Sequence, residues 1–370
     1  MTDHSPVTAG GPSEVRRSAT DVDAAWLTSV LADRGLLPEA ARVVGVVPTP
    51  VGTGQMADTV RFALTYEPAG TGPATVVGKF TSGDPQSHAT GRIMRAYEVE
   101  VRFYAEIAPR VAVRHPGLLF AAVDPEEAWF TLLLQDVTGA SQGDELAGCD
   151  ADTAAAALRQ MAGLHGPCWE APDLAASPWV NRATPDSDAF TASIVTGVFP
   201  GFLERYGDRL EPAHVDLLRA FLPRLGEWMA RPRGPGTVVH ADFRLDNMLF
   251  TPGDPDPVVV DYQTVNWGGA AYDLAYFVGG SLEPEVRRAH VDDLLAGYQR
   301  ALGDHGVTDY PLDELQKDYR RECFGGLMMA VGASMMVKQT ERGDEMFLTN
   351  TRRHAEQALD LDALATLDGA

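Results

Sequence analysis

The chain has 370 residues, of which 45% are hydrophobic and 22% are charged, a balance typical of a soluble globular protein with room for two domains. Its 52 acidic residues outnumber its 30 lysines and arginines, giving a net charge of −22. A field of that sign repels a phosphate backbone, so the composition argues against nucleic acid as a partner.

The N-terminal region predicts an irregular entry into a folded domain. Residues 1–20 are polar and small, so we expect a disordered tail without a secretory signal, followed by a helix over residues 21–35. The three cysteines, Cys149, Cys168 and Cys323, are widely spaced and predict neither a disulfide framework nor a zinc site. A cytoplasmic location is the resulting prediction.

Residues 51–62 predict a short β-hairpin with glycines at Gly52 and Gly54. Glycines in such a hairpin allow backbone N–H groups to approach phosphates closely, because no Cβ stands in the way. The stretch is neither a Walker loop nor a full G-x-G-x-x-G, and an ordinary turn is the other interpretation.

Lysine is rare in this chain, and one lysine ends a predicted strand. Lys79 closes the apolar run of residues 74–80, whereas nearly all other basic residues are arginines. A compact ammonium and a planar guanidinium are not interchangeable, so the retained lysine indicates a specific function. A solvated lysine on a strand edge is the alternative. The helix expected over residues 92–108 carries two acidic residues that can pair with Lys79, Glu98 and Glu100.

Another apolar strand, residues 129–134, ends in a polar break at Gln135, Asp136 and Val137. From about Asp150 the pattern turns helical, beginning with a helix at residues 151–165 for which Asp150 is the candidate N-cap. Long amphipathic stretches follow at 284–302, 312–338 and 342–365. Within the second of these, the uncharged residues 324–337 are too few to span a membrane, so we expect a buried core helix.

The most informative stretch is His240-Ala-Asp242-Phe-Arg-Leu-Asp-Asn247, which follows one apolar run, while a second apolar run ends in Asp261. Phosphoryl transfer needs a carboxylate to accept the hydroxyl proton, and oxygen ligands to hold Mg²⁺. Asp242, Asn247 and Asp261 suit those roles in that order, and their spacing matches the H-x-D-x-x-x-x-N loop of kinases.

This stretch has two other interpretations. His240 alone is best explained as a structural residue at a strand end. For the joint pattern an ordinary turn is disfavoured, since two strand-like runs must both end in the right residue types. A metallohydrolase site built from His240, Asp242 and Asp261 is disfavoured, because the sequence has no H-x-x-x-H or C-x-x-C grouping.

With these residues the chain resembles the aminoglycoside phosphotransferase and choline kinase superfamily, and within it the ecdysteroid kinase-like branch. The usual loop there is H-G-D-x-x-x-x-N, so Ala241 replaces a glycine. The resemblance implies a catalytic role for Asp242 and a metal role for Asn247 and Asp261. It also implies that Asp273, in the D-L-A segment, braces the loop; an N-cap is the alternative.

The same resemblance implies where the nucleotide binds. Lys79 corresponds to the nucleotide lysine, and residues 100–104 match an E-x-x-F-Y pattern that favours Glu100 as its partner. The break after residue 134 corresponds to the hinge that meets adenine. The resulting cofactor-binding set is Lys79, Glu100, Gly52, Gly54, Gln135 and Val137.

The fold implied is α+β and protein-kinase-like, with a small β-rich N-lobe and a larger, mainly helical C-lobe. We expect a tail at 1–20, the N-lobe at 21–134, the hinge at 135–137 and the C-lobe at 138–370. The function implied is ATP- and Mg²⁺-dependent phosphorylation of a small-molecule hydroxyl, without nucleic acid or membrane insertion.

Aromatic residues between Trp169 and Trp228 favour a lipophilic or natural-product alcohol as the acceptor. An aminoglycoside attracted by the acidic surface is the first alternative. A kinase-fold module that binds nucleotide or ligand without turnover is the second, whereas a protein kinase is disfavoured because no A-P-E segment is present.

Overall fold

The computed structural model describes residues 9–52, 56–231, 233–337 and 339–368. The chain divides into two compact units. Unit 1 comprises Met1–Arg110, His115–Ala140 and Val258–Val265, and unit 2 comprises Val111–Arg114, Ser141–Pro257 and Asn266–Ala370. Unit 1 therefore includes a short segment around Asp261 that the sequence analysis placed with the C-terminal residues.

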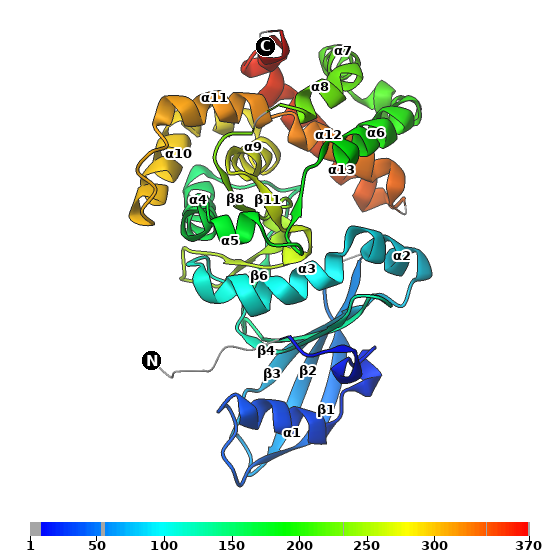
Figure 1. Ribbon diagram of the computed structural model, residues 1–370, viewed down its shortest axis with the longest axis vertical. Coiled ribbons are helices and arrows are strands. Elements are labelled where there is room, and N and C mark those ends of the chain that lie inside the picture. The colour runs from blue at the N-terminus through cyan, green and yellow to red at the C-terminus, as the bar shows by residue number, and fades with distance from the viewer. Residues whose placement is uncertain (1–8, 53–55, 232, 338, 369–370) are drawn as a thin grey trace. The chain divides into compact units, whose positions relative to one another are not determined.

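Unit 1 is built on a five-stranded antiparallel sheet in the order β1-β2-β3-β5-β4 (Figure 1). The strands are β1 (Arg42–Pro50), β2 (Ala57–Glu67), β3 (Thr75–Thr81), β4 (Leu118–Asp124) and β5 (Trp129–Gln135). A sixth, β10 (Val258–Val259), precedes a 3-10 turn at Tyr262–Thr264. Alternating burial along β2 shows that one face of the sheet supplies the core.

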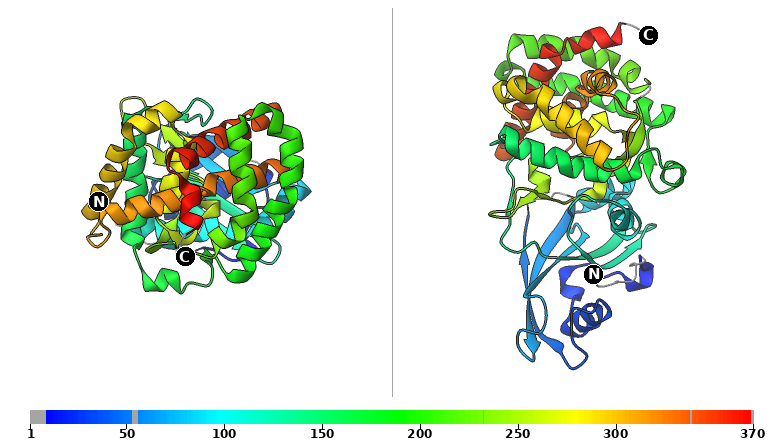
Figure 2. Two further views of the ribbon diagram at one scale, coloured as in Figure 1. Left: turned by 90° about the horizontal axis from the view of Figure 1, so that it is seen from above. Right: turned by 90° about the vertical axis from the view of Figure 1, so that its left-hand side faces the viewer.

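Helix α1 (Ala24–Asp33) lies beside this sheet, as Figures 1 and 2 show. Its buried residues Leu27, Val30 and Leu31 join Phe62 and Phe80 of the sheet in one hydrophobic cluster. Asp23 caps the helix by accepting a hydrogen bond from the Trp26 amide at 2.7 Å. The predicted entry helix is therefore present, shortened by capping at one end.

The expected tail is wrong for the part of it that the structure describes; residues 1–8 lie outside the described residues. Short 3-10 helices form at Pro12–Glu14 and Ala19–Asp21. Gly10 donates to Ala121 O at 2.8 Å and accepts from Val123 N at 3.2 Å, so the segment pairs with β4. Arg16 adds a cation–π contact with Trp26. The polar composition of the segment predicted disorder, but its order comes from bonds to residues far away in the sequence, which composition does not reveal.

The helix predicted over residues 92–108 is divided into three pieces. These are α2 (Pro85–Met94), α3 (Ala96–Arg102) and a π-helical turn at Phe103–Ile107. Arg95 separates the first two, because its φ of 56° lies in the left-handed region and ends α2. The aromatic rings of the π turn fix the segment around Asp261: Phe103 stacks on Tyr262 with centroids 3.7 Å apart. That contact explains why residues around Asp261 belong to unit 1.

Unit 2 is mainly helical. Its helices are α4 (Ala151–His165), α5 (Pro172–Ala175), α6 (Pro185–Tyr206), α7 (Pro212–Phe221), α8 (Leu225–Met229), α9 (Ala271–Gly280), α10 (Pro284–Asp304), α11 (Leu312–Glu322), α12 (Gly325–Met336) and α13 (Glu341–Asp360). Short 3-10 helices in unit 2 lie at Gly166–Cys168, Gly207–Arg209, Leu222–Arg224, Leu245–Asn247 and Ala363–Leu367. Unit 1 has another at Ala108–Arg110. Helix α10 packs beside α4 (Figure 2).

Strands in unit 2 are short and frame the loop that carries Asp242. Strand β11 (Asn266–Gly269) pairs antiparallel with β8 (Gly236–Val239) and parallel with β7 (Asn181–Arg182), while β6 (Ser141–Gln142) pairs antiparallel with β9 (Met248–Phe250). The loop at residues 240–247 thus leaves β8 and enters β9. Both of its ends are fixed by sheet pairing.

Two sequence predictions about helices are confirmed and one is refined. Helix α4 has the predicted bounds, and Asp150 caps it by accepting from Thr153 N at 2.8 Å. The stretch 312–338 divides into α11 and α12. Most of α12 is buried, as expected of a core helix, but Met336 at its end is 54% exposed. Among the described residues no helix is both long and apolar enough to cross a bilayer.

Candidate active site

In unit 1 the rare lysine lies between two carboxylates. Lys79 Nζ is 2.6 Å from Glu100 Oε1 and 2.8 Å from Asp261 Oδ1. The Lys79 and Glu100 side chains are 12% and 1% exposed, so water screens the pair poorly. Burial by itself lowers the pKa of the Lys79 ammonium, but the charges of Asp261 and Glu100 outweigh it and raise that pKa. Lys79 therefore stays charged at any physiological pH.

The choice between the two glutamates on the following helix is resolved by their contacts. Glu98 pairs instead with Arg95, the residue just before α3, at 3.0 Å and with Arg102 at the end of α3 at 3.2 Å. Burial raises the pKa of Glu100, and the Lys79 charge opposes that rise. The structure therefore brings Glu100, and not Glu98, to Lys79.

Asp261 has a backbone conformation that few residues adopt. Its φ is 69° and its ψ is 60°, in the left-handed region that an aspartate tolerates better than most side chains. One carboxylate oxygen faces Lys79, and the other accepts a 3.3 Å hydrogen bond from Gln263 Nε2. Both oxygens are hard ligands of the kind that Mg²⁺ prefers.

Among the other predicted cofactor residues, Gly52, Gln135 and Val137 also lie in unit 1. Gly52 follows β1, is exposed and has a φ of 79°, which a glycine adopts without strain. Gly54 lies outside the described residues. Gln135 ends β5, and its amide donates to Gly117 O at 2.8 Å. Next along the chain, the Asp136 carboxylate accepts from Arg61 and Thr75 at 2.8 and 2.7 Å, which fixes the backbone leading to Val137.

In unit 2 the loop carrying Asp242 is held by a buried carboxylate on α9. Asp273 is fully buried and accepts hydrogen bonds from His240 N at 2.6 Å and from Ala241 N at 2.8 Å. Its Oδ2 is also 3.1 Å from His165 Nε2, whose other ring nitrogen is 2.7 Å from the Tyr298 hydroxyl. Asp273 lies inside α9 and not at its N-cap, Ala270, so the brace is confirmed and the capping alternative is wrong.

Ala241 occupies a position that favours glycine. Its φ of 63° is in the left-handed region, where a Cβ costs about 1 kcal/mol or more. His240 is fully buried, and its Nδ1 accepts from Asp242 N at 3.3 Å, so it shapes the turn as the sequence analysis predicted. The loop thus stores a small strain just before Asp242.

Three donors reach the Asp242 carboxylate. Asn247 Nδ2 donates to Oδ2 at 2.9 Å, and the Tyr276 hydroxyl donates to Oδ1 at 3.2 Å. Arg244 Nε is 3.1 Å from Oδ1. A carboxylate accepts about four hydrogen bonds, so roughly one position stays open for a further donor. The side chain is 22% exposed, so that position is accessible.

Asn247 is oriented by the same contacts. Its Nδ2 also donates to the backbone oxygen of Asp242 at 2.8 Å, so the amide nitrogen is fully used within the loop. Its Oδ1 is consequently the free end of the side chain. An amide oxygen is a hard donor that suits Mg²⁺ better than Zn²⁺. Within the described residues no cluster of three His, Cys, Asp or Glu side chains forms a metal site.

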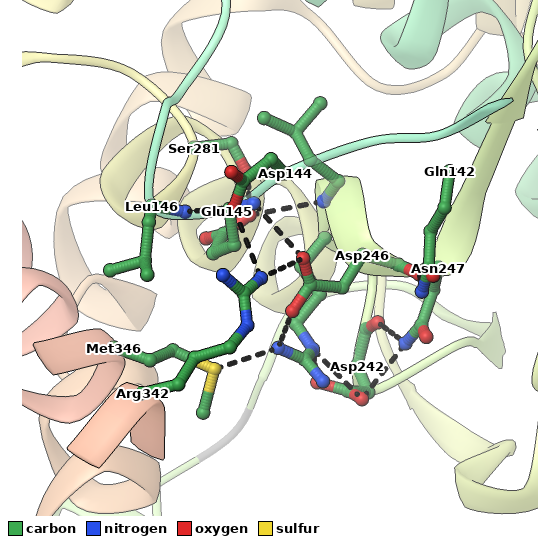
Figure 3. Close-up of polar contacts among 12 residues, drawn as sticks. Gln142, Asp144, Glu145, Leu146, Asp242, Asp246, Asn247, Ser281, Arg342 and Met346 are labelled. Carbon is green, nitrogen blue, oxygen red and sulfur yellow. Dashed lines mark hydrogen bonds and ion pairs between the residues drawn. The ribbon is translucent and has the colours of Figure 1, made fainter. Parts of the chain in front are cut away.

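A second buried carboxylate holds the far end of the loop, and Figure 3 shows its surroundings. Glu145 Oε2 accepts from Leu245 N at 3.0 Å and from the Ser281 hydroxyl at 2.8 Å. In return, Glu145 N donates to Asp246 Oδ1 at 3.0 Å. Burial raises the pKa of Glu145. Sequence reasoning missed this residue, because a single glutamate in a polar loop carries no signal of burial.

Comparison with known proteins identifies a family whose model matches the sequence of this chain. A model of the ecdysteroid kinase-like family matches residues 54–307. A solved structure from Ralstonia eutropha JMP134, named as a candidate aminoglycoside phosphotransferase, is 14% identical with a TM-score of 0.53 and covers 92% of this chain and 98% of that chain. A search of curated proteins finds no match.

Two further solved structures are similar at lower scores. A microcompartment-associated aminopropanol kinase is 14% identical with a TM-score of 0.49, and the match covers 86% of this chain and 94% of that chain. An aminoglycoside phosphotransferase solved with GDP and kanamycin is 13% identical, with a TM-score of 0.48 and coverage of 92% and 98%. The first structure, at 0.53, supports the predicted kinase-like fold, which is confirmed.

Proposed function

The chain belongs to the ecdysteroid kinase-like family, and on that premise we propose that it transfers the γ-phosphate of ATP to a hydroxyl of a small molecule. The observation that carries the proposal is the Asp242 carboxylate, fixed by three donors and left with about one open position. Such a group can orient an acceptor hydroxyl and take its proton. Because phosphoryl transfer depends mainly on alignment, a well-oriented, weak base suffices.

The unit 1 residues would serve the nucleotide. Lys79 is a permanent cation in a buried position, and Glu100 keeps its ammonium in place. Backbone groups around Gly52 and Gly54 would meet the phosphates, and those of Gln135 and Val137 the adenine edge. The carboxylate of Asp261 and the Oδ1 of Asn247 would hold Mg²⁺, which neutralises phosphate charge when bound.

For the acceptor we propose a lipophilic or natural-product alcohol. A polycationic sugar needs free carboxylates near the reacting group, yet the carboxylates around Asp242 already have partners. Asp246 Oδ2 is 2.9 Å from Arg244 Nη1. Asp144 Oδ1 is 3.1 Å from Arg342 Nη2, and Figure 3 labels both of these residues. Glu145 is buried and accepts two hydrogen bonds. This pairing leaves little local charge to attract ammonium groups.

The aromatic residues that suggested an apolar acceptor mostly form the core. Trp179, Phe202, Tyr206, Phe221 and Trp228 are at most 3% exposed, whereas Phe190 is 66% exposed. The aromatic supply therefore adds little to the proposal. The paired carboxylates are the stronger support.

The test is a screen of ATP consumption by the full chain with Mg²⁺ and a library of alcohols, including steroid-type and kanamycin-type acceptors. We expect turnover with apolar alcohols and a kcat/KM that changes little between about 0.05 and 0.5 M salt, since a neutral acceptor is not steered by charge. Efficient aminoglycoside phosphorylation that falls steeply with salt would replace our choice of acceptor. Tight Mg-ATP binding without turnover on any acceptor would instead indicate a binding module.

A further inference from the structure

Arg244 lies within the catalytic-type loop, two residues after Asp242, and its guanidinium contacts the Asp242 carboxylate. Nε is 3.1 Å from Asp242 Oδ1 and 3.3 Å from Oδ2, so a single N–H group faces both oxygens. A donor placed between two carboxylate oxygens restricts rotation about the terminal bond of the side chain, which is otherwise a broad torsion. The Asp242 carboxylate plane is therefore set in part by Arg244.

The guanidinium is anchored on its other side. Nη1 donates to Asp246 Oδ2 at 2.9 Å and to the Met346 sulfur at 3.2 Å. Asp246 is itself fixed, because its Oδ1 accepts from Glu145 N and its backbone oxygen accepts from Gln142 Nε2 at 2.6 Å. Arg244 thus connects Asp242 to the β6 segment and, through Met346, to α13. These groups come from three separate parts of the sequence.

The charge of Arg244 is held in a largely buried place, since its side chain is 21% exposed. Burial by itself lowers the pKa of the guanidinium, but the carboxylates of Asp242 and Asp246 outweigh it and raise that pKa. A planar fork can bond both carboxylates at fixed angles, whereas a lysine ammonium is a point charge on a flexible stem. Geometry, as well as charge, is what the arginine supplies.

We propose that Arg244 is a positioning residue, which holds the Asp242 carboxylate so that its open lone pair faces the acceptor hydroxyl. This inference rests on the proposed function, because it assigns Arg244 a role in the same phosphoryl transfer. Removing the guanidinium leaves Asp242 with one donor on each oxygen, Asn247 Nδ2 on Oδ2 and the Tyr276 hydroxyl on Oδ1, so the carboxylate plane is less restricted. The consequence is a lower rate of transfer at unchanged nucleotide affinity.

The test compares Arg244→Gln and Arg244→Lys with Arg342→Gln, all in the full chain. Arg342 is a matched control, because it pairs with Asp144 at 3.1 Å and lies 3.9 Å from Asp246, and no described contact joins it to Asp242. For transfer to the best acceptor of the screen and to water, we expect kcat to fall about 50-fold in Arg244→Gln and about 10-fold in Arg244→Lys. Arg342→Gln should stay within about threefold, and calorimetric Mg-ATP affinity within about threefold in all variants.

Two results would overturn the inference. One is an Arg244→Lys variant with kcat within about threefold of wild type, since the lysine keeps the charge but loses the fork; this variant decides the matter if Arg244→Gln does not fold. The other is an equal loss in Arg244→Gln and Arg342→Gln. If the wild type transfers phosphate to no acceptor, the proposed function fails, and crystal structures then decide the positioning claim: an Asp242 carboxylate unmoved in Arg244→Lys contradicts it.

Discussion

Lys79 and Asp242 are both partly buried and charged, but their surroundings differ in kind. Lys79 is held by two side-chain carboxylates, one of which is 182 residues away in sequence. Asp242 sits in a loop whose backbone N–H groups are bonded by the buried carboxylates Asp273 and Glu145. In unit 1 the charge pairs themselves define the site, whereas in unit 2 the buried charges shape the backbone that carries it.

This difference has a chemical consequence. A site made of ion pairs loses its arrangement when the charge or size of one side chain changes, because each buried charge is neutralised by its partners and water screens them poorly. A loop shaped by backbone hydrogen bonds tolerates changes at its functional side chain, because the backbone bonds remain. We therefore expect variants of Asp242 to keep their structure and variants around Lys79 to lose nucleotide binding.

The largest expected effect separates Asp242 from Asp261. Asp242→Asn should lower transfer by at least about a thousandfold, because the amide cannot accept the hydroxyl proton, while Mg-ATP affinity changes by less than about tenfold. Asp261→Ala should lose Mg²⁺-dependent nucleotide binding itself. Calorimetric titration of Mg-ATP into both variants, together with turnover, measures the contrast. Normal turnover in Asp242→Asn would refute the assignment of the base.

Replacing Lys79 tests whether the unit 1 site depends on size as well as charge. Lys79→Arg should lose nearly as much turnover as Lys79→Ala, because a guanidinium is too large for a point-charge position between Glu100 and Asp261. Lys317→Arg is the control, since Lys317 is 64% exposed and pairs with Asp313 and Glu314 on its own helix. If Lys79→Arg kept more than about half of the wild-type activity, the activation free energy would have risen by less than about 0.5 kcal/mol. That result would exclude the nucleotide role of Lys79.

Glu145 tests the brace at the end of the Asp242 loop. Glu145→Ala removes the acceptor of the Leu245 amide, a loss of about 1–3 kcal/mol, so amide exchange of residues 244–247 should accelerate. Glu145→Gln keeps an acceptor oxygen and should retain protection. Hydrogen exchange followed by mass spectrometry measures both variants, and an unchanged rate in Glu145→Ala would show that the brace does not stabilise the loop.

The pH dependence of the same pair has a defined sign. Burial raises the pKa of Glu145 above its unfolded value, so protonated Glu145 favours the folded state at low pH and this contribution is lost as pH rises. Protection of the amides of residues 244–247 against hydrogen exchange should therefore fall in the wild type, relative to Glu145→Gln, as pH rises above about 4.5 and through the raised pKa of Glu145. Exchange rates must be corrected for the intrinsic effect of pH. A constant ratio of the two proteins across pH 4–8 would contradict this.

Local signals in the sequence predicted the residues of the site better than their supports. The Asp242, Asn247 and Asp261 spacing and the rare Lys79 depend on short segments, and a single sequence shows those directly. Glu145, Arg244 and Tyr276 were missed as supports, because an isolated polar residue does not reveal which distant backbone or side-chain group it will contact. The fold class was predictable from the resemblance, whereas the break at Arg95 depends on one positive φ that no periodicity encodes.

Ala241 offers the smallest and most local test of the loop, because its φ of 63° is a backbone conformation that glycine adopts without strain and alanine does not. Ala241→Gly should relieve about 1 kcal/mol of strain, partly offset by the greater freedom of the unfolded chain, so unfolding free energy should rise by up to about 1 kcal/mol. The matched change Ala155→Gly, inside α4, should lower it by about 1 kcal/mol. Urea unfolding of the two variants checks the opposite signs. Destabilisation by Ala241→Gly would mean that the Cβ contributes packing that outweighs backbone strain, and the Asp242 loop would then depend on side-chain contacts as the Lys79 site does.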